Sequence, residues 1–114
     1  MKDFTVEFAL CDSEYLTALR LAAGAVCSAA DIDVDAIEDF KVCVTESALI
    51  LKNCGFERVR ARFFRDAGVG CEIAGAGGNP EPADNELSLA LISALVTECD
   101  IAGGKIIEKV TLLI

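Results

Sequence analysis

Apolar and polar residues alternate near the start of this chain and then change to helical spacing. Residues 4–10 carry Phe, Val, Phe and Leu at every second position, which predicts a half-buried strand. Asp12 or Ser13 can cap a helix that follows, because both side chains accept hydrogen bonds from the free N–H groups of a first turn. The apolar positions that recur every three or four residues in this helix are Leu16, Leu19, Ala23 and Val26.

A second helix is predicted to begin after Asp33 or Asp35 and to run to about Asn53, with Gly55 as its natural C-terminal residue. Its apolar residues form more than one stripe, so we expect it to be buried over much of its circumference. Glu46 lies within this apolar surface, and a carboxylate in such a place needs either a partner or a pocket. The apolar positions are Ile37, Phe40, Val42, Val44, Ala48, Leu49, Ile50 and Leu51.

The second half of the chain predicts a hairpin, a loop, a third helix and a closing strand. The third helix carries Leu87, Leu91, Ala94 and Leu95 on the face that we expect to be buried. The predicted segments are strands 58–64 and 69–74 around a turn at 66–68, a Gly- and Pro-rich loop at 75–82, a helix at 84–98, and a strand at 105–114 after a turn at Gly103-Gly104.

This order predicts an α+β fold, a two-layer α/β sandwich in one domain spanning residues 1–114. We expect a mixed or antiparallel sheet of about four strands with the three helices on one face. The closing strand is apolar, and an exposed apolar edge tends to be paired or masked. The apolar closing strand therefore predicts a homodimer or a partner-bound state.

Composition narrows the possible functions. The net charge of −9 argues against a nucleic-acid surface, which requires clustered Lys and Arg. The six cysteines lack metal spacing and there is no histidine, so we expect no metal site and reduced cysteines that pack as small hydrophobes. Without an apolar run of roughly 18 residues or a signal-peptide pattern, we expect a cytoplasmic protein with no membrane segment.

The element order, together with VTESALIL at 44–51 and LSLALISALVTECDI at 87–101, resembles the anti-sigma factor and serine-kinase family of the GHKL (histidine-kinase-like) ATPase superfamily. The resemblance covers nearly the whole chain and implies a Bergerat-type fold. In that family the second helix carries a glutamate base and, one turn later, an asparagine that holds magnesium. Glu46 stands at the glutamate position, but Ile50 stands at the asparagine position, and an aliphatic side chain cannot ligate a hard cation.

The other two family motifs are also altered. The family's Asp-x-Gly box binds adenine after the hairpin, and its place here is held by Gly75-Ala76-Gly77, which lacks the aspartate. The letters Asp-x-Gly do occur at 66–68, but after only one strand. At the start of the last helix, the phosphate-binding Gly-x-Gly-Leu is replaced by residues 86–89, Glu-Leu-Ser-Leu, so that a carboxylate would repel phosphate. The loop at 77–85 is too short for the family's nucleotide lid.

The resemblance therefore implies a degenerate regulatory protein that has lost nucleotide and binds a protein partner, either a sigma factor or an anti-sigma antagonist. Glu46 would be a vestigial base, and Gly75, Gly77 and Gly78 would be the remains of the nucleotide pocket, or only a flexible turn. The alternative is an active ATP- and magnesium-dependent serine/threonine kinase with Glu46 as base and with metal ligands taken from Asn79, Asp84 or Asn85. A third hypothesis is an unrelated α/β domain with a dry pocket for a small apolar ligand.

Overall fold

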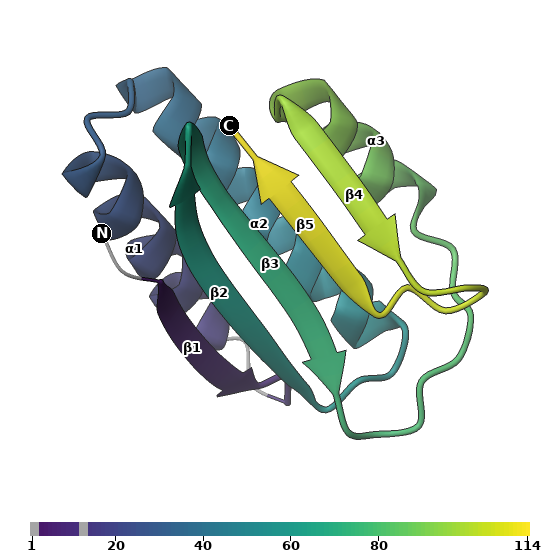
Figure 1. Cartoon of the computed structure of the whole chain (residues 1–114). Coiled ribbons are helices and arrows are strands. Elements are labelled where there is room, and N and C mark those ends of the chain that lie inside the picture. The colour runs from purple at the N-terminus through teal and green to yellow at the C-terminus, as the bar shows by residue number, and fades with distance from the viewer. Residues whose placement is uncertain (1–2, 12–13) are drawn as a thin grey trace.

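All three helices lie on one face of a five-stranded antiparallel sheet (Figure 1). This computed structural model describes residues 3–11 and 14–114, so the predicted caps Asp12 and Ser13 lie outside the described residues. The α+β class and the three helices are as predicted, whereas the sheet has one strand more than expected. In chain order the elements are β1 (Phe4–Ala9), α1 (Glu14–Ala29), α2 (Val34–Asn53), β2 (Arg58–Asp66), β3 (Gly68–Ala76), α3 (Glu86–Leu95), β4 (Glu98–Ala102) and β5 (Lys109–Leu113).

The strands are arranged in the order β1-β2-β3-β5-β4, and every neighbouring pair is antiparallel. β5 lies inside the sheet, where it pairs with β3 on one side and with β4 on the other. The expectation that the closing strand forms an exposed edge is therefore wrong. The apolar character of β5 is explained within the chain, because an inner strand needs no partner molecule to cover it.

The first two helices follow the sequence pattern. Asp33 caps α2 with its side chain, whose Oδ2 accepts a hydrogen bond from the backbone N–H of Asp35 at 3.2 Å. Gly55 follows the end of α2 with φ of 101°, a left-handed conformation that glycine adopts without strain. As expected, α2 is buried over much of its circumference, with Phe40, Cys43 and Ile50 completely shielded from solvent.

The predicted β2–β3 hairpin is present, with its turn at Ala67 (φ 58°). The predicted turn at Gly103-Gly104 is also present, and Gly103 has φ of 116°. The strand after this turn begins only at Lys109, four residues later than predicted.

The helix predicted at 84–98 is shorter than expected. α3 ends at Leu95, because Val96 is extended (φ −111°, ψ 157°) and the N–H of Thr97 donates to the carbonyl of Leu113 at 3.0 Å. Residues 98–102 then pair with β5 as the unpredicted strand β4. No Gly or Pro marks this change in the sequence, and the only local signal is the β-branched pair Val96-Thr97.

The prediction of which face of α3 is buried is largely wrong. Leu95 packs against the core, but Leu87 is 89% exposed and Leu91 is 40% exposed. Ile92 is the residue that α3 buries completely, and Leu89 packs partly against the core. Apolar residues occur all around this helix, so their spacing cannot identify the inward side.

The core between the sheet and the helices contains aromatic rings and thiols. The rings of Phe40 and Phe63 meet edge to face, with centroids 6.4 Å apart. Cys27, Cys43 and Cys71 are fully buried, as predicted for cysteine that packs as a small hydrophobe, whereas the prediction is wrong for Cys11, which is exposed. Within the described part of the chain, no helix has the length and apolar character that a membrane crossing requires.

The other face of the sheet carries a row of charges that alternate in sign from strand to strand. Arg62 on β2 bonds to Asp3, just before β1, at 2.6 Å, and to Glu72 on β3 at 3.4 Å. Lys109 on β5 lies 3.8 Å from the same Glu72 carboxylate. We call Asp3, Arg62, Glu72 and Lys109 the ionic row.

Candidate functional site

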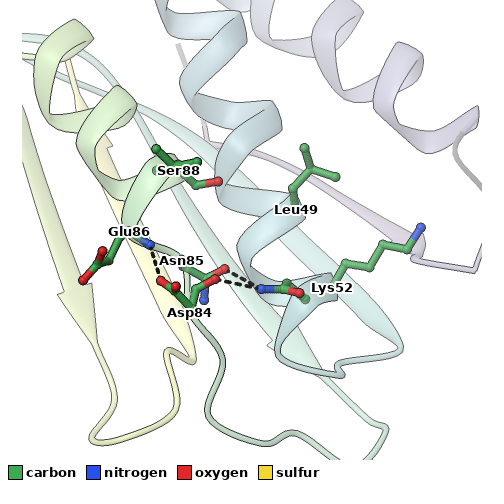
Figure 2. Close-up of a pocket in the computed structure, with 8 residues that line it drawn as sticks. Leu49, Lys52, Asp84, Asn85, Glu86 and Ser88 are labelled. Carbon is green, nitrogen blue, oxygen red and sulfur yellow. Dashed lines mark hydrogen bonds between the residues drawn. The ribbon is translucent and has the colours of Figure 1, made fainter.

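A cleft of about 730 Å³ lies between the C-terminal half of α2 and the beginning of α3 (Figure 2). It brings residues of the second predicted helix together with residues of the third. Both helices present polar and apolar side chains to it. The lining residues are Leu49, Lys52, Asn53, Asp84, Asn85, Glu86, Leu87 and Ser88.

Glu46 contributes a carboxylate beside this cleft. Residues three, four and seven positions apart share one face of a helix, so Glu46, Leu49 and Asn53 lie along the side of α2 that is turned to α3. The Oε2 of Glu46 accepts a hydrogen bond from the hydroxyl of Ser88 at 2.8 Å. The carboxylate therefore has the partner that its apolar surroundings demand.

A pair of asparagines joins the end of α2 to the beginning of α3. The Nδ2 of Asn53 donates to the Oδ1 of Asn85 at 3.0 Å and to the carbonyl of Asp84 at 3.2 Å. Asn85 is only 9% exposed, and its own Nδ2 lies 3.6 Å from the Sγ of Cys54. Asn53 thus has a second role besides ending α2, since it fixes the position of α3.

The first turn of α3 is occupied by carboxylates of the chain itself. The Oδ1 of Asp84 accepts a hydrogen bond from the N–H of Glu86 at 3.1 Å, while Asn85, the N-cap residue, makes no capping bond with its side chain. Acidic groups are favourable at a helix N-terminus because they complement its dipole. An external anion at this end of α3 would therefore meet the carboxylates of Asp84 and Glu86.

Positive charge is scarce in the cleft. Of the lining residues that the structure describes, only Lys52 is basic, and Figure 2 shows its side chain extending away from Asp84 and Glu86. The cleft therefore has an acidic end near α3 that no lysine or arginine of its lining neutralises. Nor do the described residues gather three or more Cys, Asp or Glu side chains in an arrangement that could hold a metal ion.

Ile50, at the position of the family's magnesium-binding asparagine, is completely buried in the core and does not line the cleft. The amide that enters the cleft from α2 is instead Asn53. Sequence spacing alone favoured a role for Asn53 in ending the helix. Its contact with Asn85 could have been suspected only from the presence of a second asparagine just before α3.

The glycines assigned to a vestigial nucleotide pocket do not line the cleft beside Glu46. A Cβ on Gly75 would lie 2.4 Å from the ring of Phe56, and one on Gly78 would lie 2.3 Å from the carbonyl oxygen of Gly55. Gly77 and Gly78 also have φ of 70° and 72°. These glycines allow the end of β3 to pack closely against the connection between α2 and β2.

A second hollow, of about 500 Å³, lies near the end of β1. Its lining is mainly apolar around Leu10 and Phe56, and it also includes the charged residues Lys52, Glu57 and Arg58. Of the two hollows, this one is closer to the dry pocket of the small-ligand hypothesis, but Glu46 is not part of it.

Comparisons with protein-family models and with curated proteins find no match for this chain.

Proposed function

We propose that this chain is a regulatory protein that binds another protein and has lost nucleotide binding. It would be a degenerate counterpart of the GHKL-type anti-sigma factors that its sequence resembles, and its partner would be a cytoplasmic sigma factor or an anti-sigma antagonist. The observation that carries this proposal is the acidic first turn of α3, where such a protein would receive phosphate. There, the side chain of Asp84 accepts a hydrogen bond from the backbone N–H of Glu86, and Glu86 adds a second carboxylate in the same turn.

The physical reason is electrostatic. A nucleotide phosphate needs free N–H groups, basic side chains or a metal ion to offset its charge. In this cleft the N–H of Glu86 is already bonded to Asp84, and the carboxylates of Asp84 and Glu86 are both part of the lining. The Lys52 side chain extends away from them. Like charges a few ångströms apart repel, so these groups work against phosphate binding.

The alternative is a serine/threonine kinase with Glu46 as base, ATP as substrate and magnesium as cofactor. The entry of Asn53 into the cleft from the same side of α2 as Glu46 favours it, because an amide oxygen is a possible ligand of a hard cation. Against it, the Nδ2 of Asn53 already donates to Asp84 and Asn85, which holds this amide as a link between the two helices, and the Oε2 of Glu46 already accepts from Ser88. A binding protein needs neither group to be free.

Thermal unfolding with and without ATP, ADP and magnesium tests the proposal. A ligand that binds only the native state must raise its stability, so about 1 mM nucleotide should leave Tm unchanged in this protein. A second test uses the variant Asp84→Asn/Glu86→Gln, in which the repelling charges are neutralised. If charge is the obstacle, this variant should gain a small, salt-sensitive shift with ATP.

A rise in Tm that requires both ATP and magnesium would overturn the proposal, and loss of ATP turnover in Glu46→Ala would then identify Glu46 as the base of a kinase. The amide variant Glu46→Gln serves as the matched control. It preserves size and a hydrogen-bond acceptor for Ser88 but cannot act as a base.

A further inference from the structure

α3 is unusual because most of an apolar helix is left on the surface. Ile92 is its only residue buried to the level of the core within the described structure. Leu87, 89% exposed, and Leu91, 40% exposed, lie one turn apart on its outer side, where Ala90 and Ala94 are also exposed. Contiguous apolar surface of this kind marks interaction sites on proteins that otherwise expose apolar residues singly.

The apolar surface continues from α3 onto α2. Glu46 bonds to Ser88, and Asn53 bonds to Asn85, so the two helices run antiparallel with residues 46–53 beside residues 85–88. Val42 lies one turn before Glu46 and is 39% exposed, while Leu49 lines the cleft. We define the α2–α3 groove as this surface, with the apolar residues Val42, Leu49, Leu87 and Leu91.

Acidic residues border the groove. Glu46 lies within it, and Asp84 and Glu86 lie at its α3 end. Asp39, seven residues before Glu46, is on the same side of α2. Burial, and after it the charges of Asp39 and Glu46, raises the pKa of Cys43, whose Sγ lies 3.9 Å from the carbonyl of Ile92. The groove thus combines exposed leucines with a mainly acidic border, in which Lys52 is the one basic residue of the described lining.

From this combination we infer that the α2–α3 groove docks an amphipathic helix with a basic polar face, supplied by the protein partner. The inference rests on the proposed function, since it names the surface and the chemistry of that partner. Leucines one turn apart match the spacing of an apolar helix stripe, and Lys or Arg beside that stripe would meet the carboxylates. A second copy of this chain fits poorly, because its net charge of −9 would bring like charges together.

A synthetic peptide can test the groove directly. We choose a fluorescein-labelled helix of about 14 residues, with leucines on one face and lysines on the other, which gives about four turns. Fluorescence anisotropy at physiological salt should show binding to the full chain. A peptide of identical composition with its leucines scattered around the helix should bind at least about tenfold more weakly.

Variants then locate the binding surface. Leu87→Asp should weaken binding by about tenfold or more, because it places a charge in the apolar part of the groove. Leu21→Asp is the matched control, since Leu21 is a 69% exposed leucine on α1, outside the groove, and its change should leave binding intact. Glu86→Gln should weaken binding about threefold, whereas Glu108→Gln, at an exposed acid before β5, should not.

The inference is overturned if the peptide does not bind, or if Leu87→Asp and Leu21→Asp weaken binding equally. It is also overturned if light scattering shows a homodimer that Leu87→Asp dissociates, or if uncharged lipid vesicles bind through Leu87, because the groove then serves another occupant. If the peptide does not bind and nucleotide does not raise Tm, the proposed function stands, but the partner must bind at a different surface. A magnesium-dependent rise with ATP refutes the proposed function itself, whatever the peptide does.

Discussion

Hydrogen bonds between single side chains hold α3 against α2. Glu46 accepts from Ser88, and Asn53 donates to Asn85. Capping by Asp33 could be predicted because it depends on residues within one turn. The role of Asn53 could not, because its partner lies 32 residues further along the chain and only the fold brings the two together.

Removal of the Glu46–Ser88 bond should weaken the structure by a measurable amount. We expect Ser88→Ala to lower the free energy of unfolding by about 1 kcal/mol, as for a hydrogen bond at a partly exposed site. In a Glu46→Ala background the same change should cost close to nothing, because the acceptor is gone. Urea unfolding of the four proteins gives the coupling energy.

Ser93→Ala is the matched control for this cycle, since Ser93 is an exposed serine on the same helix. Its effect should stay within about 0.5 kcal/mol. Equal losses from Ser88→Ala in both backgrounds would mean that the two side chains do not interact in solution.

At the scale of elements, α3 shows where pattern analysis reaches its limit. α1 and α2 have distinguishable inner and outer faces, and most of their predicted apolar positions are buried, although Val42 is 39% exposed and Leu16 and Leu49 are only partly buried. α3 is apolar on several sides, so its inner face is decided by what it meets, namely α2 and the sheet. The same ambiguity hid β4, because no helix-breaking residue follows Leu95.

The assignment of the inner face can be checked by truncating single side chains of α3. Ile92→Ala should lower the free energy of unfolding by about 3 kcal/mol, since it leaves a cavity in the core. Leu87→Ala, on the outer side of the same helix, should change it by less than about 0.5 kcal/mol. Urea unfolding of both variants provides the comparison, and a costly Leu87→Ala would show that α3 packs the other way round.

At the scale of the whole molecule, the sequence was sufficient for the class of the fold but not for the order of its strands. The β2–β3 hairpin could be predicted because its strands are adjacent in sequence. The insertion of β5 between β3 and β4 depends on contacts between distant segments. The cleft has the same origin: Glu46 could be singled out, but only the packing of α3 brings Ser88 to Glu46 and Asn85 to Asn53.

The buried thiols should make the whole molecule sensitive to alkali. Burial raises the pKa of Cys27 to about 11, and burial followed by the nearby Asp39 raises that of Cys43 to about 12, from a value of 9.0 in the unfolded chain. The unfolded chain therefore releases these protons first as the pH rises. Their contribution to stability is complete below about pH 9 and is lost as the pH approaches 11 to 12.

Urea unfolding at about pH 8 and about pH 10.5 should show this loss as a falling free energy of unfolding. Cys43→Ala should flatten the decline, even though it lowers stability at both pH values by leaving a small cavity. Cys11→Ala is the control, because Cys11 is exposed. A decline of the same steepness in Cys43→Ala would exclude this thiol as a source of the alkaline sensitivity.

The ionic row on the uncovered face has a consequence for how the strands find their alignment. Exposed ion pairs of this kind contribute little to stability one by one. Successive residues of a strand face opposite sides, however, so a slip of β2 by one residue would turn Arg62 away from Asp3 and Glu72 and under the helices. There it would be a dehydrated cation without a counter-ion, which is a far larger penalty than any single pair is worth. These four charges therefore contribute more to the choice of strand register than to the stability of the sheet, because they favour the observed alignment over alignments shifted by one residue.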